Sequence, residues 1–209
     1  MRDGRRSGAA ILAAALLVSN GGVSAHRLDE CLQASRLAVE DGRIDLEVSL
    51  TPGVEVAEAL IGDIDRDRDR VFSASEQQGF VSRVLMDLDV AHDSHPLDLA
   101  AGTATFPEPE AVLRGEGTIH IRSLARLDAQ APGPHHVTFT NRHQPDVSVY
   151  LANALVPASP RVAVTGQRHS SDQRELTIDY TLRTERSASM SLWLLGGVAV
   201  ALAALLIRR

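Results

Sequence analysis

Hydrophobic and polar residues alternate along much of the chain between residues 26 and 187, a pattern typical of strands that bury one face. The clearest run covers residues 43–50, where Ile44, Leu46, Val48 and Leu50 alternate with polar or charged residues. A second apolar run at 35–39 precedes it, and Asp41-Gly42 between the two predicts a tight hairpin turn. Further strands are predicted at 85–90, 97–105, 117–123, 136–140, 147–151, 161–165 and 175–182.

Two stretches with helical periodicity interrupt this series of strands. Residues 54–64 place their apolar side chains on one side, and residues 75–85 do the same. Thr51-Pro52 predicts the start of the first helix, with proline at its first position. The spacing of the strands predicts a mainly β domain, an immunoglobulin-like β-sandwich with one inserted helix-loop-helix over residues 54–86.

Between the two predicted helices lies an acidic run of twelve residues, 65–76, in which aspartate alternates with arginine before a closing glutamate. A hard cation such as Ca²⁺ takes about six to eight oxygen ligands, often including a bidentate carboxylate. The run resembles the EF-hand calcium loop, and the resemblance implies a set of ligands. They would be the side chains of Asp65, Asp67 and Asp69, the backbone carbonyl of Val71, Ser73 directly or through water, and both carboxylate oxygens of Glu76.

The register of this loop can be tested in the sequence itself. A start at Asp63 would put Ala74, which cannot ligate, in the closing position, whereas a start at Asp65 puts Glu76 there. The loop departs from the family because Arg70 replaces a glycine and Phe72 replaces an aliphatic residue. The three arginines should also weaken cation binding. No second loop of this kind is present in the sequence, which favours a structural or weak calcium site.

An ordinary turn is the simpler interpretation of the same residues. Alternating acidic and basic residues are common in solvated turns, and Ser73-x-x-Glu76 is a capping box for the following helix. This interpretation leaves the distance from Asp69 to Glu76 and the helical patterns on both sides unexplained. We therefore expect a calcium ion as the ligand of the loop.

The two ends of the chain predict export and membrane anchoring. Residues 1–25 combine three arginines, an apolar run at 9–18 and Val23-Ser24-Ala25, which is typical of a cleaved signal peptide and makes His26 the mature N-terminus. Residues 188–209 include eighteen uncharged residues, from 190 to 207, followed by Arg208-Arg209. This length suits one transmembrane helix with its basic end in the cytoplasm, so that the domain at 26–187 faces the periplasm or the exterior. A sorting tail that is removed after export is the alternative.

Composition narrows the classes of partner. The formal net charge of −6 and the absence of lysine argue against nucleic acid as a ligand. The single cysteine, Cys31, allows no internal disulfide and is predicted to be a small buried hydrophobe. No G-x-S-x-G, H-E-x-x-H or phosphate-binding motif is present, so no enzymatic activity is predicted.

Two further segments bear on function. Residues 26–30 and 149–157 resemble periplasmic domains that precede membrane regions of the HupE/UreJ type, which implies a metal-linked role in the cell envelope with a protein partner there. With a single predicted span, the chain is expected to lack the transporter portion. A terminal His26 with a second histidine could instead bind copper or nickel, as an accessory protein would. His92, His95, His135 and His136 are expected in turns. A domain that binds partners without any metal is the third alternative.

Overall fold

The structure, a computed structural model, describes residues 29–184, and these form two five-stranded sheets with few helices. The first sheet has the strand order β5-β6-β2-β1-β8 and comprises β1 (Cys31–Glu40), β2 (Arg43–Pro52), β5 (Leu99–Thr105), β6 (Ile119–Arg126) and β8 (Ser148–Ala154). The second has the order β4-β3-β7-β10-β9 and comprises β3 (Leu88–His92), β4 (His95–Pro96), β7 (Gly133–Asn141), β9 (Val162–His169) and β10 (Glu175–Leu182). The prediction of a mainly β fold is therefore confirmed.

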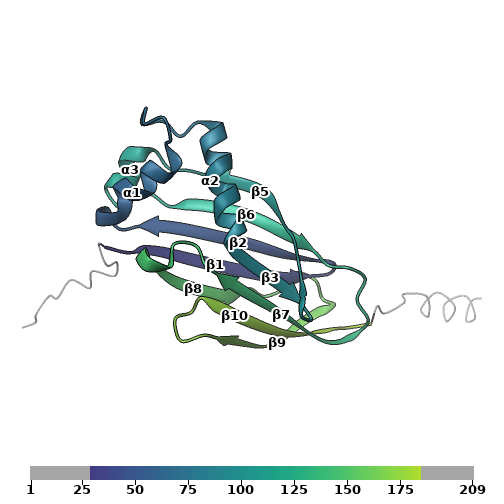
Figure 1. Ribbon diagram of the computed structural model, residues 1–209. Helices are drawn as coiled ribbons and strands as arrows, with labels where there is room; N and C mark the ends of the chain where they lie inside the picture. Colours follow the sequence, from purple (N-terminus) through teal and green to yellow (C-terminus); the bar gives the residue numbers. More distant parts are fainter. Residues whose placement is uncertain (1–28, 185–209) are drawn as a thin grey trace, which may run out of the picture.

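The hairpin predicted from Asp41-Gly42 is present. Glu40 pairs with Arg43, and Gly42 takes the positive φ of 80° that the turn requires. The first sheet is mixed: β1 pairs in parallel with β8, whereas the other strand pairs of this sheet are antiparallel. Figure 1 shows the strands running lengthwise, with the helices gathered at one end.

Alternation along β2 becomes a buried face, as the sequence predicts. The apolar residues from Ile44 to Leu50 are almost fully buried and belong to a single hydrophobic cluster. Phe139 on β7 and Ile178 on β10 belong to the same cluster, so the two sheets share one core. Cys31 is buried as predicted, and this burial raises the pKa of its thiol to about 12.

The helix-loop-helix follows β2 and precedes β3. Helix α1 spans Val54–Ile64 and α2 spans Ala74–Met86, within one residue of the predicted ranges. The predicted start at Thr51-Pro52 is wrong: Pro52 ends β2, and Gly53 is the N-cap of α1. The physical reason is that a residue before proline disfavours helical backbone, so Thr51 extends the strand.

Short elements escaped prediction. Helix α3 (Pro109–Leu113), strand β4 and the 3-10 turn η1 (Pro145–Val147) contain too few residues to show a period. The predicted signal peptide at 1–25 and the anchor at 188–209 lie outside the described residues, as does His26. Within residues 29–184, none of the helices has the length and apolar character needed to cross a membrane.

Candidate metal centre

The acidic loop joins the two helices, and its carboxylates converge from both ends. Asp65 is the C-cap of α1, and Glu76 lies in the first turn of α2. One carboxylate oxygen from each of Asp65, Asp67 and Glu76 lies within 4.8 Å of the other two. Three of the six predicted ligands are thus brought together.

Asp65 organises the loop from its centre. Asp65 is only 2% exposed. Its carboxylate accepts hydrogen bonds from the backbone N–H groups of Asp69, at 3.2 Å, and Arg70, at 2.9 Å. A buried carboxylate needs such donors to offset the loss of water. The chain therefore wraps around Asp65.

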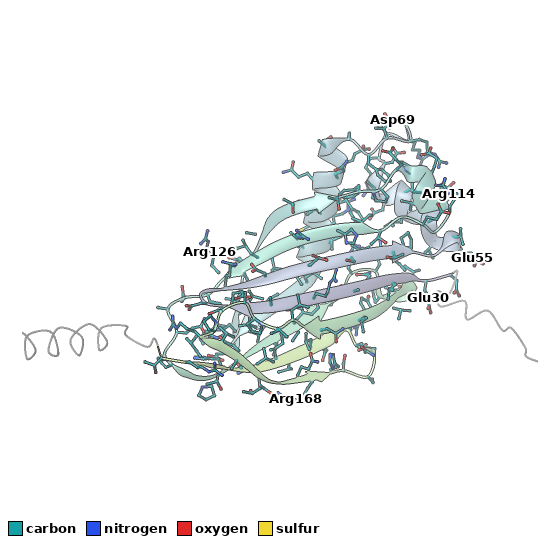
Figure 2. All side chains as sticks on the ribbon, turned by 180° about the vertical axis from the view of Figure 1, so that it is seen from behind. Glu30, Glu55, Asp69, Arg114, Arg126 and Arg168 are labelled. Atoms are coloured by element: carbon teal, nitrogen blue, oxygen red, sulfur yellow. The ribbon has the colours of Figure 1, made fainter. Side chains whose placement is uncertain are left out.

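The tip of the loop consists of two successive aspartate turns. Asp67 accepts a hydrogen bond from the N–H of Asp69 at 3.2 Å, and Asp69 accepts one from the N–H of Val71 at 2.8 Å. Asp69 is not part of the converging group and lies at the outer end of the helical region (Figure 2). The carbonyl oxygen of Val71 accepts a hydrogen bond from the N–H of Ser73 at 3.2 Å.

Ser73 and Glu76 form the capping box that the sequence allows. The hydroxyl of Ser73 accepts a hydrogen bond from the N–H of Glu76, and Oε2 of Glu76 accepts one from the N–H of Ser73 at 3.0 Å. Oε1 of Glu76 also accepts a hydrogen bond from the N–H of Arg66 at 2.6 Å. Glu76 therefore fastens the start of the loop to the start of α2, and the capping box and the converging carboxylates coexist.

The pKa values of two loop carboxylates are shifted in opposite directions. The hydrogen bond from the backbone of Asp69 lowers the pKa of Asp67, but desolvation and the neighbouring charges of Asp69 and Glu76 outweigh it, so the pKa is raised. The hydrogen bonds from the Ser73 side chain and the Arg66 backbone lower the pKa of Glu76. A divalent cation would relieve the repulsion that acts on Asp67.

The three arginines of the loop differ in backbone and in partner. Arg68 and Arg70 have positive φ values of 64° and 66°, so both adopt the left-handed backbone that favours glycine. Nη2 of Arg70 lies 3.2 Å from Oε1 of Glu58, and Nη2 of Arg66 lies 3.2 Å from Oδ1 of Asp63. The guanidinium groups of Arg66 and Arg70 thus pair with carboxylates outside the predicted ligand set.

Phe72, which follows Val71 in the acidic loop, is buried. Its ring meets Phe106 edge-on, with centroids 6.1 Å apart, and Phe106 meets Phe80 of α2 in the same way at 6.0 Å. The aromatic ring of Phe72 is accommodated by this edge-on packing against Phe106, which directly follows β5. This contact ties the loop to the rest of the domain.

The described residues contain a second group with ligand chemistry, formed by His92, Asp93 and His135. The sequence showed these histidines only as residues of expected turns. The pairing of β3 with β7 brings them together, and no local spacing predicts that pairing.

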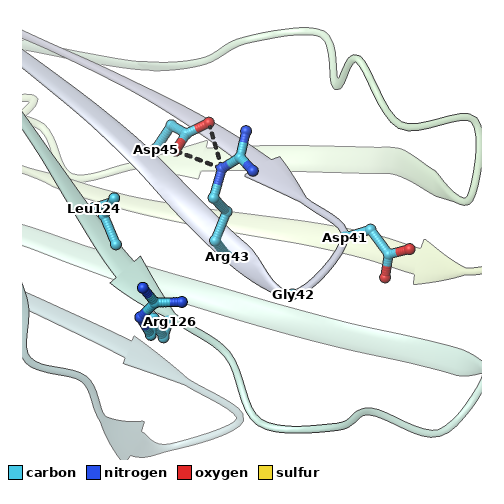
Figure 3. Close-up of a pocket in the computed structure, with 6 residues that line it drawn as sticks. All are labelled: Asp41, Gly42, Arg43, Asp45, Leu124 and Arg126. Carbon is cyan, nitrogen blue, oxygen red and sulfur yellow. Dashed lines mark hydrogen bonds and ion pairs between the residues drawn. The ribbon is translucent and has the colours of Figure 1, made fainter.

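A hollow beside the β1–β2 turn offers no comparable set of groups (Figure 3). Within it, Nε of Arg43 donates to both carboxylate oxygens of Asp45, at 2.8 and 3.0 Å, so these charges satisfy each other. Its lining consists of Asp41, Gly42, Arg43, Asp45, Leu124 and Arg126.

Comparisons with protein-family models, with curated proteins and with solved structures gave no match for this chain.

Proposed function

We propose that residues 65–76 are an EF-hand loop that binds Ca²⁺ and thereby fixes α1 relative to α2. The observation that carries the proposal is the convergence of Asp65, Asp67 and Glu76, whose carboxylate oxygens lie within 4.8 Å of one another. These three residues come from both ends of the loop, so one cation that binds all three joins the two helices. The remaining ligands of the proposal are Asp69, the carbonyl of Val71, and Ser73.

The existing hydrogen bonds favour a modest role for the cation. Asp65 and Glu76 already hold the loop closed through backbone N–H groups. Calcium therefore has little unfolded backbone to order, and Glu76 must exchange some of its hydrogen bonds for the ion. The expected dissociation constant is in the weak extracellular class, on the order of 10⁻⁴–10⁻³ M.

The proposal places this loop on an exported protein. Residues 26–187 would form an immunoglobulin-like β-sandwich that carries the EF-hand and faces the periplasm or the exterior. A signal peptide at 1–25 and a single-pass anchor at 188–209 would attach it to the cell membrane, where it would meet a protein partner of the envelope. These assignments rest on the apolar runs and the basic residues at the two ends of the sequence.

Calorimetric titration of the chelator-treated protein with Ca²⁺ tests the function, and titration with Mg²⁺ serves as the control ion. One Ca²⁺ should bind with saturation. Glu76→Gln should abolish the binding, since it removes the bidentate carboxylate.

Matched substitutions separate ligation from general loss of charge. Glu58→Gln makes the same chemical change as Glu76→Gln, and Asp63→Asn removes another carboxylate charge. Both residues lie near the loop but outside the ligand set, so these variants should leave the affinity nearly unchanged. Circular dichroism in chelator establishes that each variant is folded. Absence of Ca²⁺ binding up to several millimolar, or equal losses in Glu76→Gln and Glu58→Gln, would refute the proposal in favour of a plain capped turn.

A further inference from the structure

A compact cluster of imidazole and carboxylate groups lies where the β3–β4 turn meets β7. His92 ends β3 and His95 begins β4, which leaves Asp93 and Ser94 as the two residues of the turn, with positive φ values of 47° and 69°. The N–H of Asp93 donates to the carbonyl of His136 at 3.0 Å, and the N–H of His136 donates to Oδ1 of Asp93 at 2.9 Å. The turn is therefore held against β7 by two hydrogen bonds.

His135, at the start of β7, has an acceptor at each ring nitrogen. Its Nε2 lies 2.8 Å from the carbonyl oxygen of Ala131, and its Nδ1 lies 2.6 Å from Oδ2 of Asp93. A neutral imidazole carries one N–H, so the other nitrogen presents a lone pair. If Nε2 donates to Ala131, the lone pair of Nδ1 faces a carboxylate oxygen, and a proton or a metal ion between the two atoms is needed to make that contact attractive.

The same arrangement is characteristic of histidines that bind metals. Such a histidine usually donates its second ring N–H to a backbone carbonyl or a carboxylate, which fixes the tautomer and aims the first nitrogen at the metal. Ala131 provides that carbonyl for His135. The side chain of His135 is 13% exposed, and its ring stacks on Tyr180 with centroids 5.5 Å apart, so its orientation is fixed.

His92 supplies a second imidazole on the same carboxylate. Its Nε2 lies 3.5 Å from Oδ2 of Asp93 and 2.9 Å from the hydroxyl of Tyr180. The O–H of Tyr180 donates to Oε1 of Gln130 at 2.7 Å, so this hydroxyl accepts the N–H of His92 Nε2, and a metal ion bound at Nε2 would take the place of that proton. One ligand atom each from His92, Asp93 and His135 lies within 4.8 Å of the other two. Asp93 is 35% exposed, which leaves an open side for water.

We propose that His92, Asp93 and His135 form a binding site for a divalent transition-metal ion of the Zn²⁺ class. Two imidazoles and one carboxylate suit Zn²⁺, with water in a fourth position, and do not suit Ca²⁺, which prefers oxygen ligands alone. Bonds of about 2.0–2.1 Å in a tetrahedral site put neighbouring ligand atoms roughly 3.3 Å apart. The separation between His92 and Asp93 already fits, and the pair of Asp93 and His135 needs to open by roughly 0.7 Å.

The bound ion would fasten the β3–β4 turn to β7 and so stabilise the second sheet. The site is independent of the proposed calcium loop. It lies at the end of β3 that is farther from α2 along the chain, and it shares no ligand with residues 65–76.

Titration of the chelator-treated full-length protein with Co²⁺, followed by its visible absorption, tests the site, and Zn²⁺ is then added as competitor. One Co²⁺ should bind and be displaced by Zn²⁺. Asp93→Asn should weaken Zn²⁺ at least tenfold while keeping the fold, because asparagine tolerates the left-handed backbone of the turn. His135→Gln should have an effect at least as large. The control is His169→Gln, because Nε2 of His169 also lies 2.8 Å from a backbone carbonyl, that of Ala152, but outside the cluster.

Two further variants separate this site from the other candidates. Zn²⁺ affinity should be unchanged in Glu76→Gln, which alters the calcium loop, and in His26→Ala, which alters the predicted N-terminus. Zn²⁺ binding that survives both Asp93→Asn and His135→Gln, or that disappears in His26→Ala, would overturn the proposal. An absence of both Co²⁺ and Zn²⁺ binding in these titrations would also overturn it and would leave His135 and Asp93 as an ion pair.

Discussion

Replacement of each loop arginine by glycine should affect stability differently at the two arginines with left-handed backbone, Arg68 and Arg70, than at Arg66, which lacks it. Arg70 has a φ of 66°, whereas Arg66 is not among the residues with positive φ. Arg70→Gly removes the cost of holding a side chain in the left-handed region, about 1–2 kcal/mol. Both substitutions add roughly 0.5–1 kcal/mol of backbone entropy to the cost of folding.

The ion pairs lost in the two variants nearly cancel in the comparison. Arg70 pairs with Glu58 through side chains that are 50% and 65% exposed, and Arg66 pairs with Asp63 at the same distance of 3.2 Å. Exposed pairs of this kind contribute about 0.2–1 kcal/mol each. The remaining difference is the relief of backbone strain, so Arg70→Gly should be more stable than Arg66→Gly by about 1–2 kcal/mol.

Urea unfolding measured in chelator provides the assay, since calcium would otherwise contribute to the comparison. With a slope of about 2 kcal/mol per molar, the midpoints of the two variants should differ by roughly 0.5–1 M. Arg68→Gly should fall beside Arg70→Gly because its φ is 64°. Equal midpoints for Arg66→Gly and Arg70→Gly would refute the loop conformation, and with it the register that places Glu76 in the closing position.

Three further substitutions test the packing, the capping and the charges of the domain. Phe80→Ala should cost about 3–5 kcal/mol of unfolding free energy in urea titrations, since the ring is fully buried. Ser73→Ala should cost about 1 kcal/mol in the same titrations in chelator, because it removes the N-cap of α2. Burial raises the pKa of Glu47, but Arg122 and Arg36 outweigh burial, so the pKa of this carboxyl is lowered in the folded protein. The ionised carboxylate therefore stabilises the fold above its ordinary pKa, and this stabilisation is lost as the pH falls through the folded-state pKa. Glu47→Gln should therefore flatten the decline in stability between about pH 6 and pH 3. No loss of stability in Ser73→Ala, no loss in Phe80→Ala, or an unchanged acid decline in Glu47→Gln would each contradict the corresponding contact.

The predictable parts of this fold are those in which neighbouring residues carry the information. The alternation along β2 and the apolar faces of α1 and α2 are local patterns, and each became a buried face in the structure. The arrangement of strands within the sheets depends on contacts between distant residues. The parallel pairing of β1 with β8 joins Cys31 to Ser148, and nothing in either segment alone specifies it.

The candidate sites divide in the same way. The carboxylates of the acidic loop lie within twelve consecutive residues, and the resemblance to an EF-hand loop implied that Asp65 and Glu76 would meet, as they do. Asp69 was predicted to belong to the same set, but its carboxylate accepts a hydrogen bond from the N–H of Val71 and is not part of the converging group. The spacing indicates which residues can approach one another, but it does not specify which of them do.

The two proposed ions would act on different parts of the domain because different contacts hold their ligands. The acidic loop meets the domain through Phe72, whose ring packs on Phe106 after β5 of the first sheet. The imidazole cluster joins β3 to β7 within the second sheet. An ion in the acidic loop would therefore act on the packing between the helices and the first sheet, whereas an ion at His135 would act on the pairing of β3 with β7 in the second sheet. Since the two sheets share one core, each ion can raise the stability of the whole domain without any contact between the sites.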